Sequence, residues 1–198
     1  MPKPAVFLDR DGTLNVEAGY IRNLDDLRLM PGAADAIRRL NAVGVPAILA
    51  TNQSGPARGY YPESWVQALN ARLMSLLAAE GAHLDDVFYC PHHPEGVVEA
   101  FTQDCRCRKP ETGMLEDAAA KHGLDLSACY MIGDKSTDVE VGQRAGCRTV
   151  LLRSGFGEQV LAGTYQWPVE PDHIALTVVE AIDWVLTDLE SRRPVARG

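Results

Sequence analysis

Short apolar runs alternate along the chain with longer stretches in which apolar residues recur every three or four positions. A short run that is apolar on both faces is typical of a buried parallel strand, and the longer amphipathic stretches are typical of helices. The pattern therefore predicts an α/β fold with a Rossmann-like parallel sheet and helices on both faces. The predicted strands cover residues 5–8, 45–50, 87–89, 128–132 and 149–152.

Amphipathic stretches between and after these runs predict the helices. They cover residues 31–44, 62–81 and 112–122, a short stretch before Gly146, and a C-terminal helix that begins at Pro171-Asp172 and carries the apolar stripe Ile174, Val178, Val179, Ile182 and Val185. Residues 16–30 are predicted to form an irregular flap, which is too short for a cap domain. We expect one domain over residues 1–190 and a flexible tail over residues 191–198.

Composition narrows the class of protein. Of the 198 residues, 46% are hydrophobic and 23% are charged, as in an ordinary globular chain. The net charge of −8 argues against a surface that binds nucleic acid. No stretch approaches the roughly 20 apolar residues that span a bilayer, and the N-terminus lacks a signal core, so we expect a cytoplasmic protein without a membrane partner. Five cysteines, an odd number, fit a reducing compartment better than a disulfide framework.

Two carboxylates, Asp9 and Asp11, directly follow the first predicted strand. Ligands bind at the carboxyl edge of open α/β sheets, and Gly12 lets the chain turn away there. Two carboxylates this close repel each other unless a cation intervenes, which favours a hard metal such as Mg²⁺. The alternative is an ordinary Asp-Arg-Asp-Gly surface turn.

Polar residues follow other predicted strands as well. Thr51 and Asn52 come after the second strand, Asp134 after the fourth, and Lys109 after a loop rich in cysteine. Because the carboxyl ends of parallel strands share one edge, we expect these side chains to converge on Asp9. Hydroxyl, amide and ammonium donors suit a transferring phosphoryl group, and carboxylates suit its Mg²⁺. The pattern therefore predicts phosphoryl-transfer chemistry.

The long loop over residues 90–107 holds a second cluster of chemical groups. Its candidate zinc ligands are Cys90, His92 or His93, Cys105 and Cys107. Two Cys/His pairs separated by 12 residues can supply four tetrahedral ligands, which predicts a closed, structural zinc site. His92 and His93 compete for one position, and His92 is favoured because it mirrors the one-residue gap of the second cysteine pair. The alternative is a set of unligated thiols.

Over residues 5 to about 152 the chain carries four ordered motifs that resemble those of the haloacid dehalogenase superfamily of phosphatases. The motifs are Asp9-x-Asp11-Gly12-Thr13, Thr51-Asn52-Gln53, Arg108-Lys109-Pro110 and Gly133-Asp134-x-x-x-Asp138. The resemblance implies a capless core in which Asp9 is the nucleophile and Asp11 the general acid and base. It also implies that Thr51 and Lys109 hold the phosphoryl oxygens. Mg²⁺ would bind the Asp9 carboxylate, the Asp11 carbonyl and Asp134.

Longer stretches, including residues 9–15 and 90–110, closely resemble the family of D-glycero-D-manno-heptose 1,7-bisphosphate 7-phosphatases. That resemblance implies catalytic Mg²⁺, structural Zn²⁺ and a sugar bisphosphate substrate on the route to nucleotide-activated heptose for the lipopolysaccharide core. Cations next to the zinc loop suit a second anionic group of the substrate. The candidate substrate-binding residues are Glu17, Gly19, Tyr20, Asn52, Gln53, Ser54, Arg58, Arg108 and Lys135.

The sequence supports three other functions less well than it supports this one. Histidinol-phosphate phosphatases share the zinc loop, but theirs is typically shorter, so the 12-residue gap favours the heptose family. A non-catalytic, metal-stabilised interaction module is disfavoured because every acidic and basic group of the site is present. A nucleotide-binding protein finds no support, because there is no Walker A sequence and Gly155-Phe156-Gly157 lacks the third glycine of a dinucleotide loop. We expect a monomer.

Overall fold

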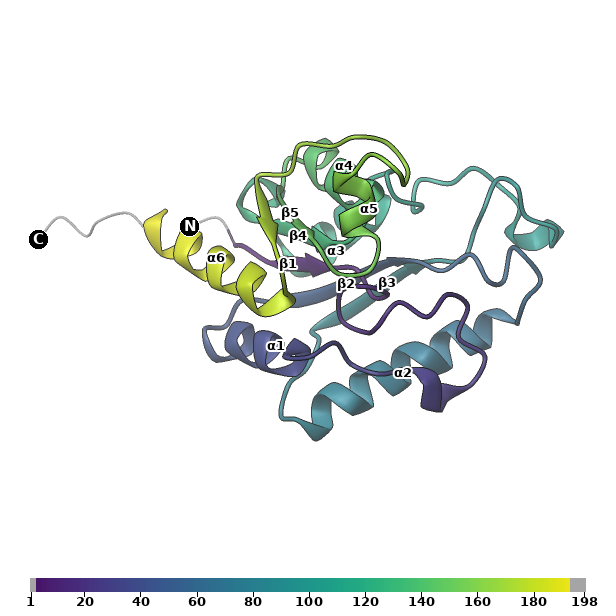
Figure 1. Ribbon diagram of the computed structural model, residues 1–198, viewed down its shortest axis with the longest axis horizontal. Helices are drawn as coiled ribbons and strands as arrows, with labels where there is room; N and C mark the ends of the chain where they lie inside the picture. Colours follow the sequence, from purple (N-terminus) through teal and green to yellow (C-terminus); the bar gives the residue numbers. More distant parts are fainter. Residues whose placement is uncertain (1–2, 193–198) are drawn as a thin grey trace, which may run out of the picture.

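The computed structural model describes residues 3–192. A six-stranded parallel sheet in the order β3-β2-β1-β4-β5-β6 forms its centre (Figure 1). The strands are β1 (Val6–Leu8), β2 (Ala47–Asn52), β3 (Asp86–Cys90), β4 (Tyr130–Gly133), β5 (Arg148–Leu152) and β6 (His173–Ala175). Leu8, the last residue of β1, pairs with Leu49 of β2 and with Ile132 of β4, so at the same edge of the sheet β4 continues to Gly133 and β2 to Asn52.

Helices cover both faces of the sheet, as predicted. They are α1 (Ala33–Ala42), α2 (Glu63–Ala79), α3 (Gly113–His122), α4 (Ser136–Arg144), α5 (Gly157–Leu161) and α6 (Val178–Ser191), with 3₁₀ turns at Leu24–Asp26, Glu99–Phe101 and Leu126–Ala128. Helices α1, α2 and α6 lie on one face of the sheet, and α3 and α4 lie on the other (Figure 1). Val6 and Leu8 pack with the first group, and Phe7 packs with the second. This alternation buries β1 on both sides, which explains its uninterrupted apolar sequence.

The structure corrects the prediction that a helix begins at Pro171-Asp172. The Asp172 carboxylate accepts the Thr149 backbone N–H at 2.8 Å, which fixes this segment beside β5, where it forms the edge strand β6. Ile174, predicted to lie in the helical stripe, is 42% exposed on that strand. Helix α6 begins after Thr177, whose side chain accepts a backbone N–H of the first turn.

Smaller differences concern the ends of elements. β2 begins and ends two residues later than predicted, which pairs Thr51 with Tyr89 of β3. α5 has no counterpart among the predicted helices, because five residues are too few to show a helical period. Of the predicted tail over residues 191–198, Ser191 is the last residue of α6, and residues 193–198 lie outside the described residues. No helix in the described part of the chain is long and apolar enough to cross a membrane.

Candidate active site

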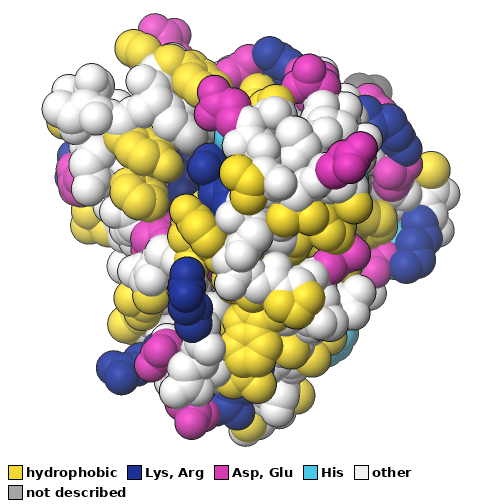
Figure 2. Space-filling view, turned by 90° about the vertical axis from the view of Figure 1, so that its right-hand side faces the viewer, with side chains coloured by type: hydrophobic (Ala, Val, Ile, Leu, Met, Phe, Trp, Pro, Cys, Tyr) yellow, Lys and Arg dark blue, Asp and Glu magenta, His cyan; other side chains and the backbone are white. Residues whose placement is uncertain are grey.

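The carboxyl ends of the central strands open into a cavity of about 340 Å³. The predicted residues that line it are Asp9, Asp11, Glu17, Gly19, Tyr20, Asn52, Gln53, Ser54, Arg58, Arg108, Lys109 and Lys135. Thr51 and Asp134 are buried and support this lining from behind. Figure 2 views the side of the molecule toward which these strand ends point, and it shows Lys and Arg side chains lying among hydrophobic ones. One cavity thus collects residues from distant parts of the sequence.

Asp9 is nearly buried in this cavity, with an exposed fraction of 4%. Its Oδ1 lies 3.0 Å from Lys109 Nζ, and its Oδ2 lies 3.6 Å from Lys135 Nζ. Burial raises the pKa of Asp9, but the charges of the two lysines and a hydrogen bond with Thr51 outweigh burial and lower the pKa below its usual range. Asp9 is therefore ionised, as a carboxylate nucleophile must be.

Lys109 is a buried ammonium group with several protein partners. Besides Asp9, its Nζ lies 2.6 Å from Asp138 Oδ1 and donates to the Ala50 carbonyl at 2.7 Å. Its backbone is held by Asn52, whose Oδ1 accepts the Lys109 N–H and whose Nδ2 donates to the Lys109 carbonyl, both at 2.9 Å. Both polar groups of Asn52 are therefore engaged by the protein, which favours a positioning role over the predicted contact with substrate.

Asp134 and Asp138 join Asp9 in a buried cluster whose carboxylate oxygens lie within 4.8 Å of one another. Lys135 Nζ lies 3.3 Å from Asp134 Oδ1 and 3.3 Å from the Asp11 carbonyl oxygen, so it faces all three predicted Mg²⁺ ligands. Burial raises the pKa of Asp134 to about 7, and the charges of Asp9 and Asp138 add to the rise. Hard oxygen ligands and this excess of negative charge fit a divalent cation such as Mg²⁺.

Two glycines make room for the Asp134 carboxylate. Gly12 and Gly155 have left-handed φ angles of +83° and +55°. A Cβ atom would lie 2.3 Å from Asp134 Oδ2 at Gly12 and 2.1 Å from it at Gly155, which is closer than atoms can approach. The Phe156 backbone N–H donates to the same oxygen at 2.8 Å. Any side chain at either glycine would therefore displace a predicted metal ligand.

The Asp11 side chain is fixed by neighbours that sequence analysis did not assign to the site. Arg10 forms a 3.0 Å ion pair with it, and Asn15 Nδ2 donates to it at 3.0 Å. Arg10 is itself buried and donates to Asn70 of α2 at 3.1 Å. Gln53, predicted to bind substrate, donates to Asp11 at 2.8 Å. These contacts hold Asp11 in one orientation at the wall of the cavity.

Arg58 and Arg108 line the cavity without carboxylate partners among the described residues. Arg108 donates to the His92 carbonyl at 3.1 Å, and Arg58 Nη2 lies 2.9 Å from His93 Nε2. The Arg58 Nε atom is buried and has no hydrogen-bond partner. Burial lowers the pKa of Arg108, and the charge of Arg58 lowers it further. An anion in the cavity would therefore give both guanidinium groups a partner of opposite charge.

The predicted flap contributes three residues to the cavity wall. Glu17 Oε1 accepts the Gly19 backbone N–H at 2.8 Å, and Glu17 Oε2 lies 3.3 Å from Lys135 Nζ. The Tyr20 hydroxyl lies 3.2 Å from Ser54 Oγ, which links the flap to the loop after β2. The flap therefore connects two parts of the site that are distant in sequence.

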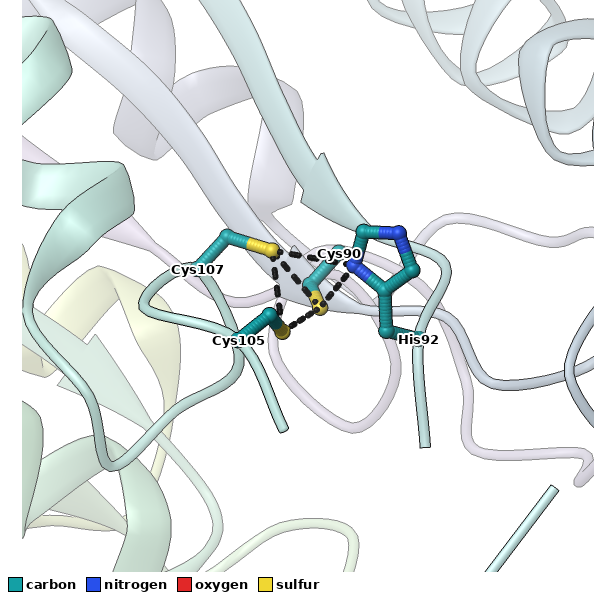
Figure 3. Close-up of side chains that lie close together, drawn as sticks. All are labelled: Cys90, His92, Cys105 and Cys107. Carbon is teal, nitrogen blue, oxygen red and sulfur yellow. Dashed lines mark hydrogen bonds between the residues drawn. The ribbon is translucent and has the colours of Figure 1, made fainter. Parts of the chain in front are cut away.

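Cys90, His92, Cys105 and Cys107 bring their donor atoms within 4.8 Å of one another, and their side chains point toward a common centre (Figure 3). The sulfurs lie 3.0–3.4 Å apart, closer than the roughly 3.8 Å that tetrahedral bonds of 2.3 Å to zinc imply, so a bound ion would move them slightly apart. Hydrogen bonding with Cys90 lowers the pKa of Cys107, which favours the thiolate form that binds metal. The donor set fits Zn²⁺, and His93 lies outside it.

Comparison with known proteins decides the family. A family profile described as HAD-hydrolase-like matches residues 106–181. The chain is 53% identical over 196 residues to the D-glycero-D-manno-heptose-1,7-bisphosphate 7-phosphatase of Thermosynechococcus vestitus, with 97% of this chain and 100% of that protein covered. The chain belongs to the D-glycero-D-manno-heptose 1,7-bisphosphate 7-phosphatase family. The resemblance seen in the motifs is thereby confirmed.

Other members of the heptose bisphosphate phosphatase family agree. The D-glycero-beta-D-manno-heptose-1,7-bisphosphate 7-phosphatase of Escherichia coli K12 is 41% identical over 187 residues, covering 94% of this chain and 90% of that protein. The crystal structure of D,D-heptose 1,7-bisphosphate phosphatase from B. bronchiseptica, complexed with magnesium and phosphate, superimposes with a TM-score of 0.82 at 31% identity. That comparison covers 94% of this chain and 99% of the other, and it confirms the haloacid dehalogenase-type fold.

In this member of the heptose bisphosphate phosphatase family, five lining residues were not predicted. They are Tyr61, Thr137, Phe156, Tyr165 and Gln166. Thr137 lies inside the motif that carries Asp134, so its position could have been inferred from that motif. Phe156, Tyr165 and Gln166 follow the last motif and have no local pattern that would place them at the cavity.

Proposed function

We propose that this protein is a Mg²⁺-dependent phosphatase that removes the 7-phosphate of D-glycero-D-manno-heptose 1,7-bisphosphate. The observation that carries the proposal is the sharing of one cavity by Asp9 and two guanidinium groups, those of Arg58 and Arg108, that have no carboxylate partner within residues 3–192. A monophosphate needs only the catalytic residues, whereas a bisphosphate gains from a second cationic contact. The names of the full-length relatives support the same substrate.

In the proposed mechanism, the Asp9 carboxylate attacks phosphorus, and the bond between phosphorus and the sugar oxygen breaks. Asp11 protonates that oxygen and then takes a proton from the water that hydrolyses the aspartyl phosphate, which releases phosphate and restores Asp9. The Thr51 hydroxyl and Lys109 hold the phosphoryl oxygens during both steps. Asp9, Asp134 and the Asp11 carbonyl would hold Mg²⁺, which offsets the negative charge of the phosphoryl group.

We also propose that the Cys/His cluster binds Zn²⁺ in a structural role. Four protein ligands leave no open position for water, so the metal would not take part in hydrolysis. Its contribution would be to fix the loop that leads directly into Arg108 and Lys109. Cysteines without disulfide bonds fit a reducing compartment, and we therefore assign the reaction to the cytoplasm.

The test measures kcat/KM of the Mg²⁺-loaded protein for both anomers of heptose 1,7-bisphosphate and for histidinol phosphate. We expect the bisphosphate to be preferred, and we expect Asp9→Asn to lower kcat by about 10⁴-fold or more. Thermal unfolding of Asp9→Asn checks that the variant is folded. A preference for histidinol phosphate would overturn the substrate, and hydrolysis that survives in Asp9→Asn would overturn the mechanism.

A further inference from the structure

The connection between β5 and β6 contributes an aromatic wall to the cavity. Phe156, Tyr165 and Gln166 line the same cavity as Asp9. The rings of Phe156 and Tyr165 stack, with centroids 4.3 Å apart and an angle of 10° between their planes. Lys135 Nζ lies 5.4 Å from the centroid of the Phe156 ring. A flat apolar surface therefore lies beside the cations of the site.

This wall is attached to the helix that follows the Asp134 motif. Ser136 Oγ donates to the Trp167 carbonyl at 2.6 Å, and Gln166 Oε1 accepts the Thr137 backbone N–H at 3.3 Å. Both partners lie in the first turn of α4, which begins two residues after Asp134. The aromatic wall is therefore fixed relative to the acidic cluster, as a surface that discriminates between substrates must be.

Gln166 has an unusual backbone conformation. Within residues 3–192 it is the one non-glycine residue with a positive φ, +56°. A left-handed backbone is unfavourable for glutamine and persists where surrounding contacts hold it, which makes such residues candidates for function. The Gln166 Oε1 atom is engaged by Thr137. The Nε2 hydrogens have no protein acceptor among the described residues, so they are available to a ligand.

We infer that Tyr165 and Gln166 determine specificity for the sugar of the substrate. The stacked rings of Phe156 and Tyr165 cover C–H groups of the polyol, and the Gln166 amide donates to one of its hydroxyl oxygens. The two arginines bind the second anion, whereas this wall discriminates between the carbon skeletons that carry it. The inference rests on the proposed function, because it concerns the leaving group of that reaction.

The experiment compares heptose 1,7-bisphosphate with acetyl phosphate, which carries a phosphoryl group and no sugar. Gln166→Gly removes the amide and suits the left-handed backbone, so loss of the side chain is separated from backbone strain. Tyr165→Leu removes the stacked ring. For each variant we expect the ratio of kcat/KM for the bisphosphate to that for acetyl phosphate to fall about 3- to 10-fold, mainly through KM, as loss of one neutral contact predicts. Gln159→Ala, an exposed change in α5 of the same segment, is the matched control and leaves the ratio unchanged.

The outcomes separate this inference from the proposed function. If wild type hydrolyses the bisphosphate and the ratio stays within 2-fold in both variants, the wall has no role in specificity, because a 2-fold change is below about 0.5 kcal/mol. An equal loss on both substrates also overturns the inference, because the wall would then act only by supporting Asp134. Hydrolysis of acetyl phosphate without hydrolysis of the bisphosphate by wild type would overturn both the proposed function and this inference.

Discussion

Asp138 offers a sharp test of how charge is balanced beneath the cavity. Its Oδ1 lies 2.6 Å from Lys109 Nζ, and its Oδ2 accepts the Lys135 backbone N–H at 3.0 Å. Asp138→Asn replaces one oxygen by an NH₂ group of nearly the same size. In one orientation of the amide its NH₂ group faces the Lys109 ammonium, and in the other it faces the Lys135 backbone N–H, so in both a donor faces a donor. Asp138 is 1% exposed, so water cannot replace the lost acceptor.

The size of the effect follows from the partners that remain. Breaking a buried ion pair by removing one charge costs about 3–5 kcal/mol. Lys109 keeps two partners in the variant, Asp9 at 3.0 Å and the Ala50 carbonyl at 2.7 Å. We therefore expect the free energy of unfolding to fall by about 2–3 kcal/mol, which is at or below the low end of the range for a broken buried ion pair. We also expect kcat to fall, because Asp9 is then the one carboxylate paired with Lys109 among the described residues, and the closer pairing lowers the reactivity of this nucleophile.

Urea unfolding in Mg²⁺-free buffer, followed by far-UV circular dichroism, measures the stability, and steady-state turnover measures kcat. Glu140→Gln is the matched control, because Glu140 lies on the same helix but forms an exposed pair with Arg144. We expect its urea midpoint to match wild type. An unfolding free energy for Asp138→Asn within about 1 kcal/mol of wild type would refute the reasoning.

Two further predictions concern the zinc cluster and acid stability. Purified protein is expected to contain about one zinc per chain by atomic absorption, and Cys105→Ser should contain less and unfold at a lower temperature; equal zinc content in both would contradict the site. Burial raises the pKa of Asp188, but hydrogen bonds with Tyr130 and Arg148 outweigh it and lower the pKa below 3.8. The stabilising effect of Asp188 is therefore present above pH 3.8 and is lost as the pH falls through the lowered pKa. Asp188→Ala should lower the free energy of unfolding by about 1–3 kcal/mol at pH 7, and by progressively less below pH 3.8. A difference in urea midpoint that does not change with pH would contradict this prediction.

The sheet and the positions of the candidate catalytic residues were predictable because their signals are local. β1 is apolar at every position, and Asp9 follows it directly, so strand and chemical group are read from one stretch of sequence. The same holds for Thr51 at the end of β2 and for Asp134 after β4. Parallel pairing then brings these strand ends to one edge, a consequence of the fold class and not of any particular contact.

Other parts of the structure depend on contacts between distant residues and could not be predicted in this way. β6 is only three residues long, which is too short to show a period of its own. Its position beside β5 depends on the hydrogen bond between Asp172 and Thr149, which the pattern of apolar residues does not reveal. The left-handed backbone of Gln166 likewise has no local signal, since glutamine is not a residue that favours it. Arg10 was missed for a different reason, because its buried partner Asn70 lies 60 residues away on α2.

In the proposed reaction, residues with a local sequence signal and residues placed by distant contacts have different roles. The groups that act on phosphorus lie at strand ends, where the sheet fixes their positions and the sequence reveals them. The groups available to the rest of the substrate lie on loops, and their positions depend on other loops: Arg108 is held by the His92 carbonyl, and Gln166 by the first turn of α4. A change in loop contacts can therefore alter substrate choice while the strand ends keep the same chemistry, which is why motif sequence predicts phosphoryl transfer more directly than it predicts the sugar.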